Sequence, residues 1–491
     1  MKAAGATAAL GTARVYWQGA HATHLVSGRP FQSPLGKLHA EGLALLGSAG
    51  WTRVPAADPR VPGFALTTRK GADFPAAGAG LPAVRQFPQR CTAVLDDKRL
   101  LAECLEAEGC PHLAPRTWPD AESFLHQHSA STTAQAPADW QLAAGGSRRG
   151  LWFLKHRHGV KGQAVHPFTS LPPLLERLRS LGGGGGGGGG RQQWVVQEGV
   201  SPPLLLPDGR KFMLRAHVLL LLLGSSRQEQ AQGQPQAQPA GLAGAAGAAG
   251  QLAAWVHRDV IVTPHARPLC QPAAGAGEAA AGAADPAVHV SSRGSSHPRP
   301  YLLSELRLGA QQQLDAEGQR AGQQRGPGEP WETGSGSLQR QLWHRVCEIS
   351  AAAVAAAARR GLVPGEADQR ATLYHLLAFD FGVADAAAAP PPDPAGQPSG
   401  QGAAAATPAA GAVQPPRQPQ VLLLEANSYP AIASGTMAAV PRAVYTRLMA
   451  DLLSLVVLPG LRRAQAAEQT AAEQAAAEPE APQEGGFCRV L

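Results

Sequence analysis

Two acidic residues and an amide follow apolar runs in the last quarter of the chain. Glu425 comes directly after the run 421–424, and Asn427 comes two positions later. This pattern predicts a buried strand on which both side chains point the same way. A second apolar segment, 373–381, carries Asp380. Because a buried carboxylate is costly unless paired, and Mg²⁺ prefers oxygen ligands, we predict that the three residues bind magnesium. For Glu425 alone, a strand end that meets water is an equal alternative.

Basic residues occupy two further segments with strand character. Lys155 ends the apolar segment 151–155, and a short turn with two glycines, 159–162, follows it. Glycine permits close backbone approach and lysine neutralises charge, so this pattern can bind phosphate. The alternative is a basic loop that is exposed to solvent, because such a loop has the same pattern of residues. The GxxxxGK[ST] motif of P-loop proteins is absent.

The segment 211–218 is predicted to be a strand with Lys211 and Arg215 on one face and apolar residues on the other. Its basic face could meet phosphates in a cleft or could simply meet water. The segment 255–262 is predicted to be a single strand that pairs antiparallel with it. Helices are expected at 96–108, 338–360 and 440–457, and a first strand at 13–17.

Composition limits the ordered part of the chain and its partners. Segments such as 228–250 are built from Gln, Ala, Gly and Pro, so we expect them to be surface loops. Lys plus Arg is 43 and Asp plus Glu is 36, giving a net charge of +7 that suits an acidic partner. No aromatic and basic repeat of an RNA-binding type is present, so no nucleic acid is expected.

The six cysteines form no CxxC pair, which favours a reducing, intracellular compartment. No apolar run has transmembrane length, so we expect no stable membrane association. We also expect the protein to be cytoplasmic and to be a monomer. The last four residues, 488–491, approximate a prenylation motif. A short apolar strand is the favoured alternative there.

The order of the motifs resembles the tubulin–tyrosine ligase-like family, whose fold is ATP-grasp. Residues 97–99 look like its early Asp-Lys segment, and 151–162 are similar to its strand-Lys-GxKG loop. The likeness spans about residues 90 to 460 and also rests on 195–215, 377–381 and 423–430.

The resemblance implies an α/β (α+β) ATP-grasp fold with the nucleotide cleft between its central and C-terminal lobes. We expect an N-terminal lobe at 1–90, a central lobe at 91–200 and a C-terminal lobe at 201–462, followed by a low-complexity tail at 463–491. Insertions are expected near 225–254, 272–286 and 386–419.

The resemblance also implies ATP and Mg²⁺ as cofactors, with a role for each matching residue. Asp380, Glu425 and Asn427 would bind Mg²⁺ and the phosphates. Lys211 and Arg215 would be catalytic, facing the γ-phosphate and the acyl-phosphate. The remaining nucleotide contacts would come from Lys155, Lys161, Gly162, Ser291 and the adenine hinge, Gln197, Glu198, Gly199 and Val200.

The implied reaction is ATP-dependent ligation of an amino acid to a protein carboxylate, with an acidic tubulin tail as the first candidate acceptor. A location at the cytoskeleton or cilium would fit that acceptor. Met213 replaces the family's usual Asp, and 289–292 departs from its HLTN segment, which leaves activity and substrate choice open. The alternatives are a weakly catalytic module that binds acidic tails and an ATP-grasp ligase for a small molecule.

Overall fold

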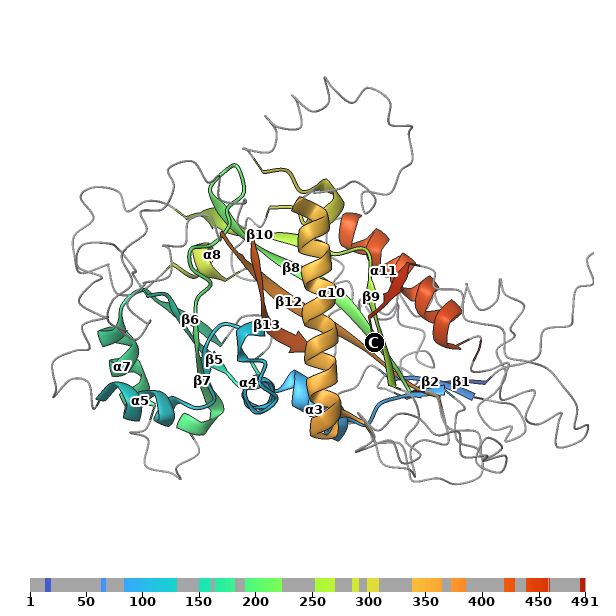
Figure 1. The fold of residues 1–491 in the computed structure, drawn as a ribbon, viewed down its shortest axis with the longest axis horizontal. Helices are drawn as coiled ribbons and strands as arrows, with labels where there is room; N and C mark the ends of the chain where they lie inside the picture. Colours follow the sequence, from blue (N-terminus) through green and yellow to red (C-terminus); the bar gives the residue numbers. More distant parts are fainter. Residues whose placement is uncertain are drawn as a thin grey trace, which may run out of the picture.

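The chain folds around one large sheet and one small sheet (Figure 1). The computed structural model describes residues 14–18, 63–67, 84–129, 150–159, 164–181, 190–222, 252–269, 285–290, 298–308, 338–363, 372–385, 419–428, 439–457, 459 and 486–490. The predicted insertions and tail lie mostly outside these residues.

The large sheet runs in the order β1-β2-β3-β12-β8-β10-β11, with β13 beside β12, β9 beside β8 and β14 beside β9. Its long central strands are antiparallel, whereas β1, β2 and β3 join it in parallel. The strands are β1 (Arg14–Gln18), β2 (Gly63–Thr67), β3 (Val84–Gln86), β8 (Arg210–Leu222), β9 (Leu252–His257), β10 (Ile261–Pro268), β11 (Tyr301–Leu302), β12 (Thr372–Ala384), β13 (Gln420–Asn427) and β14 (Phe487–Arg489).

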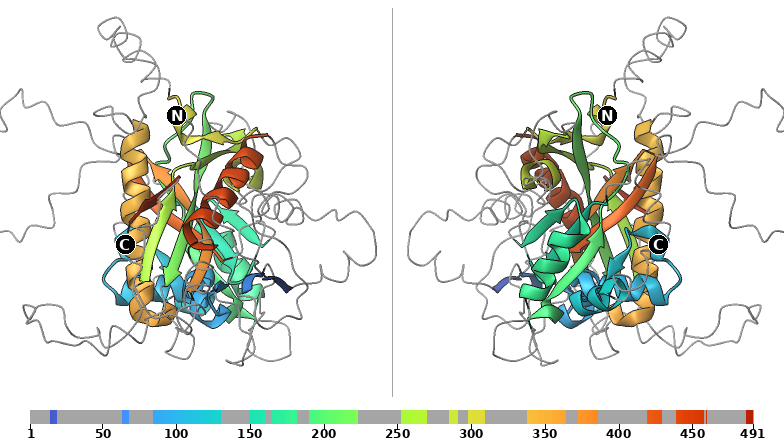
Figure 2. Two further views of the ribbon diagram at one scale, coloured as in Figure 1. Left: turned by 90° about the vertical axis from the view of Figure 1, so that its right-hand side faces the viewer. Right: turned by 90° about the vertical axis from the view of Figure 1, so that its left-hand side faces the viewer.

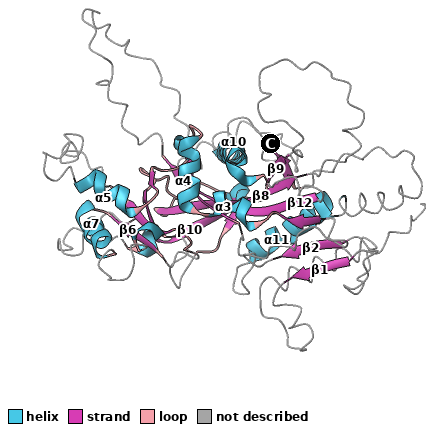
Figure 3. Ribbon diagram, turned by 90° about the horizontal axis from the view of Figure 1, so that it is seen from below, coloured by secondary structure: helices cyan, strands magenta, loops and turns pink. Residues whose placement is uncertain are grey.

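Helices cover both faces of the large sheet. Helices α3 (Gln89–Asp96), α4 (Lys98–Ala107) and α10 (Leu338–Ala357) lie on one face, and α11 (Ala439–Leu452) lies on the other (Figures 2 and 3). Alternate residues of β8, from Leu214 to Leu222, pack into the core beneath α10. The opposite residues of β8, including Arg215, therefore face the side of α11.

The small sheet has the order β4-β7-β5-β6 and forms a second core with two helices. This core is built around Phe124, Leu154 and Leu174. Its elements are β4 (Thr117–Trp118), α5 (Ala121–Ser129), β5 (Trp152–His156), β6 (Val165–Phe168), α7 (Leu171–Ser180) and β7 (Trp194–Glu198). Helices α3 and α4 pack into the large core, and the predicted lobe limits stay predictions.

One predicted strand is wrong as a single element. The segment 255–262 is divided at Arg258 between β9 and β10, and both strands pair with β8. The amide of Asp259 donates to Nδ1 of His257 at 3.2 Å, and the amide of Val260 donates to the Arg258 carbonyl at 2.9 Å. These two hydrogen bonds form a turn between β9 and β10. The turn competes with the backbone hydrogen bonds that would continue a single strand along β8.

The last described residues return to the large sheet. Strand β14 pairs antiparallel with β9, with Cys488 opposite Val256. Cys488 and Val490 pack against the large core. The end of the chain therefore contains the short terminal strand that the sequence favoured for this segment. Among the described helices, none is both long and apolar enough to cross a bilayer.

Deleting 228–250 should leave the fold intact. Leu222, the last residue of β8, pairs with Leu252, the first of β9, so a short turn can join the two strands. Shortening the connection changes its closure entropy by on the order of 1 kcal/mol. We expect a melting temperature within about 10 °C of the wild type. A larger fall in a thermal melt would show that the deleted segment contributes packing.

Candidate functional site

Three strands place charged side chains in one row of the large sheet. Asp380 on β12 lies opposite Glu425 on β13. The β8–β12 register pairs Leu377 with Val218, and continuing it places Asp380 opposite Arg215. Directly opposite residues share a face of the sheet. The sheet register therefore gathers Arg215, Asp380 and Glu425, which are far apart in the sequence.

Arg215 and Asp380 form a bidentate ion pair in which the carboxylate is buried and the guanidinium is partly exposed. Nε of Arg215 donates to Oδ1 of Asp380 at 2.7 Å, and a terminal nitrogen donates to Oδ2 at 2.8 Å. The carboxylate raises the pKa of Arg215, so the guanidinium stays charged. Burial raises the pKa of Asp380, and Arg215 acts in the opposite direction. Removing either side chain would leave the other charge without its counter-ion, which is strongly unfavourable for a buried group.

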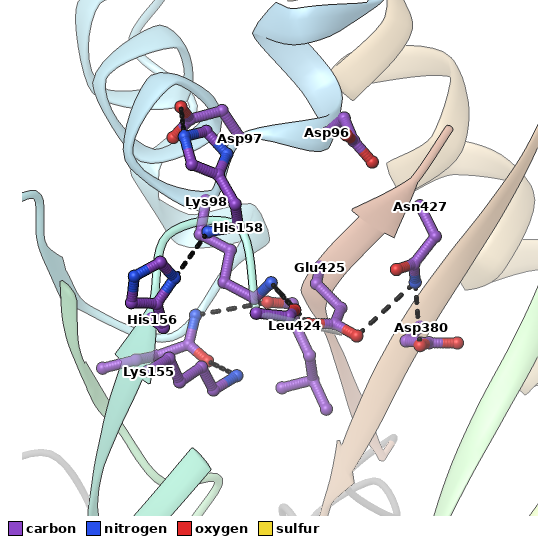
Figure 4. A network of polar contacts seen from close by, with 12 residues as sticks. Asp96, Asp97, Lys98, Lys155, His156, His158, Asp380, Leu424, Glu425 and Asn427 are labelled. Carbon is purple, nitrogen blue, oxygen red and sulfur yellow. Dashed lines mark hydrogen bonds and ion pairs between the residues drawn. The ribbon is translucent and has the colours of Figure 1, made fainter. Parts of the chain in front are cut away.

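Glu425 lies beside two lysines (Figure 4). Nζ of Lys98 is 3.3 Å from Oε2 of Glu425. Burial alone would raise the pKa of Glu425, but Lys98, Lys155 and Arg215 together lower it to about 2. The carboxylate is therefore ionised across the physiological range.

Asn427 completes the acidic cluster, which we define as Asp380, Glu425 and Asn427. Its Nδ2 donates to Oδ2 of Asp380 at 3.3 Å and to Oε1 of Glu425 at 3.4 Å. Two carboxylates and an amide fit Mg²⁺, which binds few protein oxygens and keeps waters or phosphate oxygens as its other ligands. Since the amide nitrogen faces the carboxylates, coordination through Oδ1 requires the amide to rotate.

A polar chain joins the small sheet to the acidic cluster. Nζ of Lys155 donates to Oε1 of Gln197 at 2.6 Å. Nε2 of Gln197 donates to Oγ1 of Thr117 at 3.0 Å and to the Leu424 carbonyl at 3.5 Å. A small pocket between the two sheets is lined by Lys98, Lys155, Gln197 and Leu424, among others. The predicted phosphate lysine and the first hinge residue thus lie next to the strand that carries Glu425.

The other predicted hinge residues connect the sheets. Glu198 ends β7, and burial raises its pKa. Gly199 lies against Leu151, where an added Cβ would approach the leucine side chain to 2.6 Å. A Cβ on Gly382 would approach Val200 to 2.7 Å. A side chain at either glycine would therefore force its neighbour, Leu151 or Val200, to shift.

Lys211 lies on the same face of β8 as Arg215 but contacts a different partner. Its Nζ is 2.8 Å from Nδ1 of His289. Burial lowers the pKa of Lys211 to about 8, and burial together with Lys211 lowers that of His289 to about 3. The structure does not describe Lys161, Gly162 or Ser291, so their predicted roles stay predictions.

Lys98 is the contact residue that sequence reasoning missed. The Asp97 side chain caps α4 by accepting from the amide of Arg99 at 2.9 Å. Asp97 also pairs with Arg157, which fixes the turn after β5. Lys98 then reaches both Glu425 and the Gly159 carbonyl, the latter at 3.2 Å. The sequence signal for Lys98 is the Asp-Lys pair at the start of a helix.

Lys155 gives a pH-dependent prediction. Burial lowers the pKa of Lys155 from 10.5 to about 8 in the folded protein. Between pH 8 and 10.5 the unfolded chain holds the proton more tightly, so stability rises with pH. Relative to Lys155→Met, the wild type should gain up to roughly 1.4 kcal/mol per pH unit in this window. Urea unfolding at several pH values checks this, and a constant difference between the two proteins would contradict it.

One family model matches part of the chain. The model of the tubulin-tyrosine ligase family matches residues 79–223, a segment that contains Lys98, Lys155, Gln197 and Arg215. This match confirms the resemblance there and, with the mixed helix and sheet architecture, supports a tubulin–tyrosine ligase-like, ATP-grasp fold. The acidic cluster lies beyond the matched segment.

Among solved structures, the C-terminal domain of K. lactis Pby1 matches with a TM-score of 0.49 and 12% identity, over 98% of each chain. That domain is described as an ATP-grasp enzyme interacting with the mRNA decapping enzyme Dcp2. No curated protein matches the chain.

Proposed function

We propose that this protein is an ATP- and Mg²⁺-dependent ligase that joins an amino acid to a protein carboxylate. The observation that carries the proposal is the row of Arg215, Asp380 and Glu425, with Lys98 at the start of α4 and Lys155 on the small sheet beside it. Two carboxylates beside three cations suit a polyphosphate bound through a divalent cation.

The residues of the site have distinct roles in this proposal. Asp380, Glu425 and Asn427 hold the magnesium ion. Lys98 and Lys155 neutralise phosphate charge, and both lie where the two sheets meet. Arg215 lies beside the acidic cluster and stabilises negative charge that develops during phosphoryl transfer. The residues from Gln197 to Val200 join the sheets and contact the nucleotide base.

The proposed reaction has two steps. A substrate carboxylate takes the γ-phosphoryl group of ATP, which releases ADP and leaves an acyl-phosphate. The amine of the second substrate attacks the acyl carbon, loses a proton and expels inorganic phosphate, which forms the amide bond. Mg²⁺ supplies charge neutralisation on the phosphate oxygens. The protein mainly orients the groups and neutralises charge.

An acidic protein tail is the proposed acceptor, with tubulin as the first candidate. The net charge of +7 favours an acidic partner, and the tubulin-tyrosine ligase family match is the basis for testing tubulin first. We place the protein in the cytoplasm, where this acceptor would be available.

Mass spectrometry of tubulin tails tests the proposal directly. The protein is incubated with tubulin, ATP, Mg²⁺ and mixed amino acids, and the expected product is a tail heavier by one or more amino-acid residues. ATP turnover without a tubulin product would favour a small-molecule ligase. Binding of the tail without ATP turnover would favour a binding module.

A further inference from the structure

Arg215 has a second partner from the helix on its side of the sheet. Tyr445 lies on α11, is 2% exposed, and forms a side-chain hydrogen bond with Arg215. Because a guanidinium only donates, the phenol oxygen is the acceptor. Asp380 fixes the plane of the guanidinium through two bonds, and Tyr445 adds a second contact to it from α11.

The two partners of Arg215 differ in charge. Asp380 neutralises the guanidinium through two short bonds. Burial raises the pKa of Tyr445, so the phenol remains neutral at physiological pH. A neutral acceptor contacts the guanidinium without adding a second negative charge beside it. Because a guanidinium has five N–H donors, those that neither partner uses can donate to a phosphate or an acyl-phosphate.

His217 contacts the tyrosine ring from the same strand as Arg215. It lies two residues after Arg215, so both side chains share a face of β8. The rings of His217 and Tyr445 meet edge to face, with centroids 5.4 Å apart and planes at 80°. His217 is fully buried, and within the described part of the chain neither of its ring nitrogens has a hydrogen-bond partner. The contact with the His217 ring thus limits the rotation of the Tyr445 side chain.

We propose that Tyr445 is a positioning residue that orients Arg215 for phosphoryl transfer, with His217 packed behind it. This inference rests on the proposed function, because it assigns Tyr445 a role in that reaction. A purely structural Tyr445, which merely fills space under α11, is the competing explanation. The two explanations differ in whether the effect of removing the hydroxyl depends on Arg215.

A double-mutant cycle separates these explanations. Tyr445→Phe keeps the ring and removes only the acceptor. In the wild-type background it should lower kcat for ATP turnover about 10-fold or more, with KM for ATP changed less than about 3-fold. In the Arg215→Lys background the same change should cost less than about 2-fold, because the guanidinium is gone. Equal losses in both backgrounds, or no loss in the wild type, would overturn the proposal.

Tyr374→Phe is the matched control. Tyr374 is also fully buried, but it lies on β12 six positions before Asp380. Losing its hydroxyl should leave kcat within about 2-fold of the wild type. A comparable loss of kcat would show that removing any buried hydroxyl from the large sheet has this effect, which would also count against Tyr445.

Urea unfolding of the same four proteins of the cycle provides a readout that does not depend on turnover. We expect the stability losses from Tyr445→Phe and Arg215→Lys to be non-additive, as for residues in contact. If the wild type turns over no ATP with any acceptor, the proposed function fails. The unfolding cycle then still tests the contact, and additive losses would overturn the inference about Tyr445.

Discussion

Glu425→Gln should lower ATP turnover by on the order of 10²-fold or more while leaving the fold in place. The carboxylate is ionised, with a pKa of about 2, and lies opposite Asp380 among Lys98, Lys155 and Arg215. The amide has nearly the same shape but no charge, so it weakens cation binding and the stabilisation of transferring phosphate. A coupled assay of ADP release measures the effect.

Glu348→Gln is the matched control for this change. Glu348 lies on α10, its side chain is 59% exposed, and it pairs with a neighbour on its own helix, Arg345. Its replacement should leave ADP release unchanged. If Glu425→Gln consumed ATP as fast as the wild type, the assignment of the acidic cluster to catalysis would be wrong.

Arg215→Met should destabilise the folded protein by about 3–5 kcal/mol, because it leaves Asp380 buried without its cation. The carboxylate of Asp380 is 2% exposed, so water cannot replace the lost guanidinium. Asn427 still donates one hydrogen bond to it, but at 3.3 Å and without a charge. Urea unfolding measures the loss.

A second change distinguishes the loss of charge pairing from the loss of packing. Adding Asp380→Asn to Arg215→Met removes the unpaired charge and should restore most of the stability. Arg267→Met is the control, since Arg267 pairs with Asp285 at the surface with its side chain 69% exposed, and it should cost about 1 kcal/mol or less. Additive losses in the double variant would show that the ion pair itself does not determine the stability.

The sequence by itself determined the local features of the site. The apolar runs ending in acids predicted β12 and β13, and the two-residue spacing placed Glu425 and Asn427 on one side. Alternation along β8 placed Lys211 and Arg215 on one face. These predictions succeed because side-chain direction along a strand depends only on position.

Only the tertiary structure decided which of these residues meet. The strand registers pair Arg215 with Asp380 and Asp380 with Glu425, whereas Lys211, on the same strand, contacts His289. No local pattern states which strands are neighbours, because pairing depends on how the whole sheet buries its faces.

Lys98 and Tyr445 are two helical residues whose contact partners could not be predicted from the sequence. Each belongs to a helix whose existence the sequence predicted, at 96–108 and 440–457. Lys98 reaches Glu425 because Asp97 caps α4 and pairs with Arg157. Tyr445 reaches Arg215 because α11 packs on the face of β8 opposite α10. Helical periodicity predicts that a helix has an apolar face. The element that packs against this face is set by contacts between residues far apart in the sequence, and local patterns do not identify those contacts.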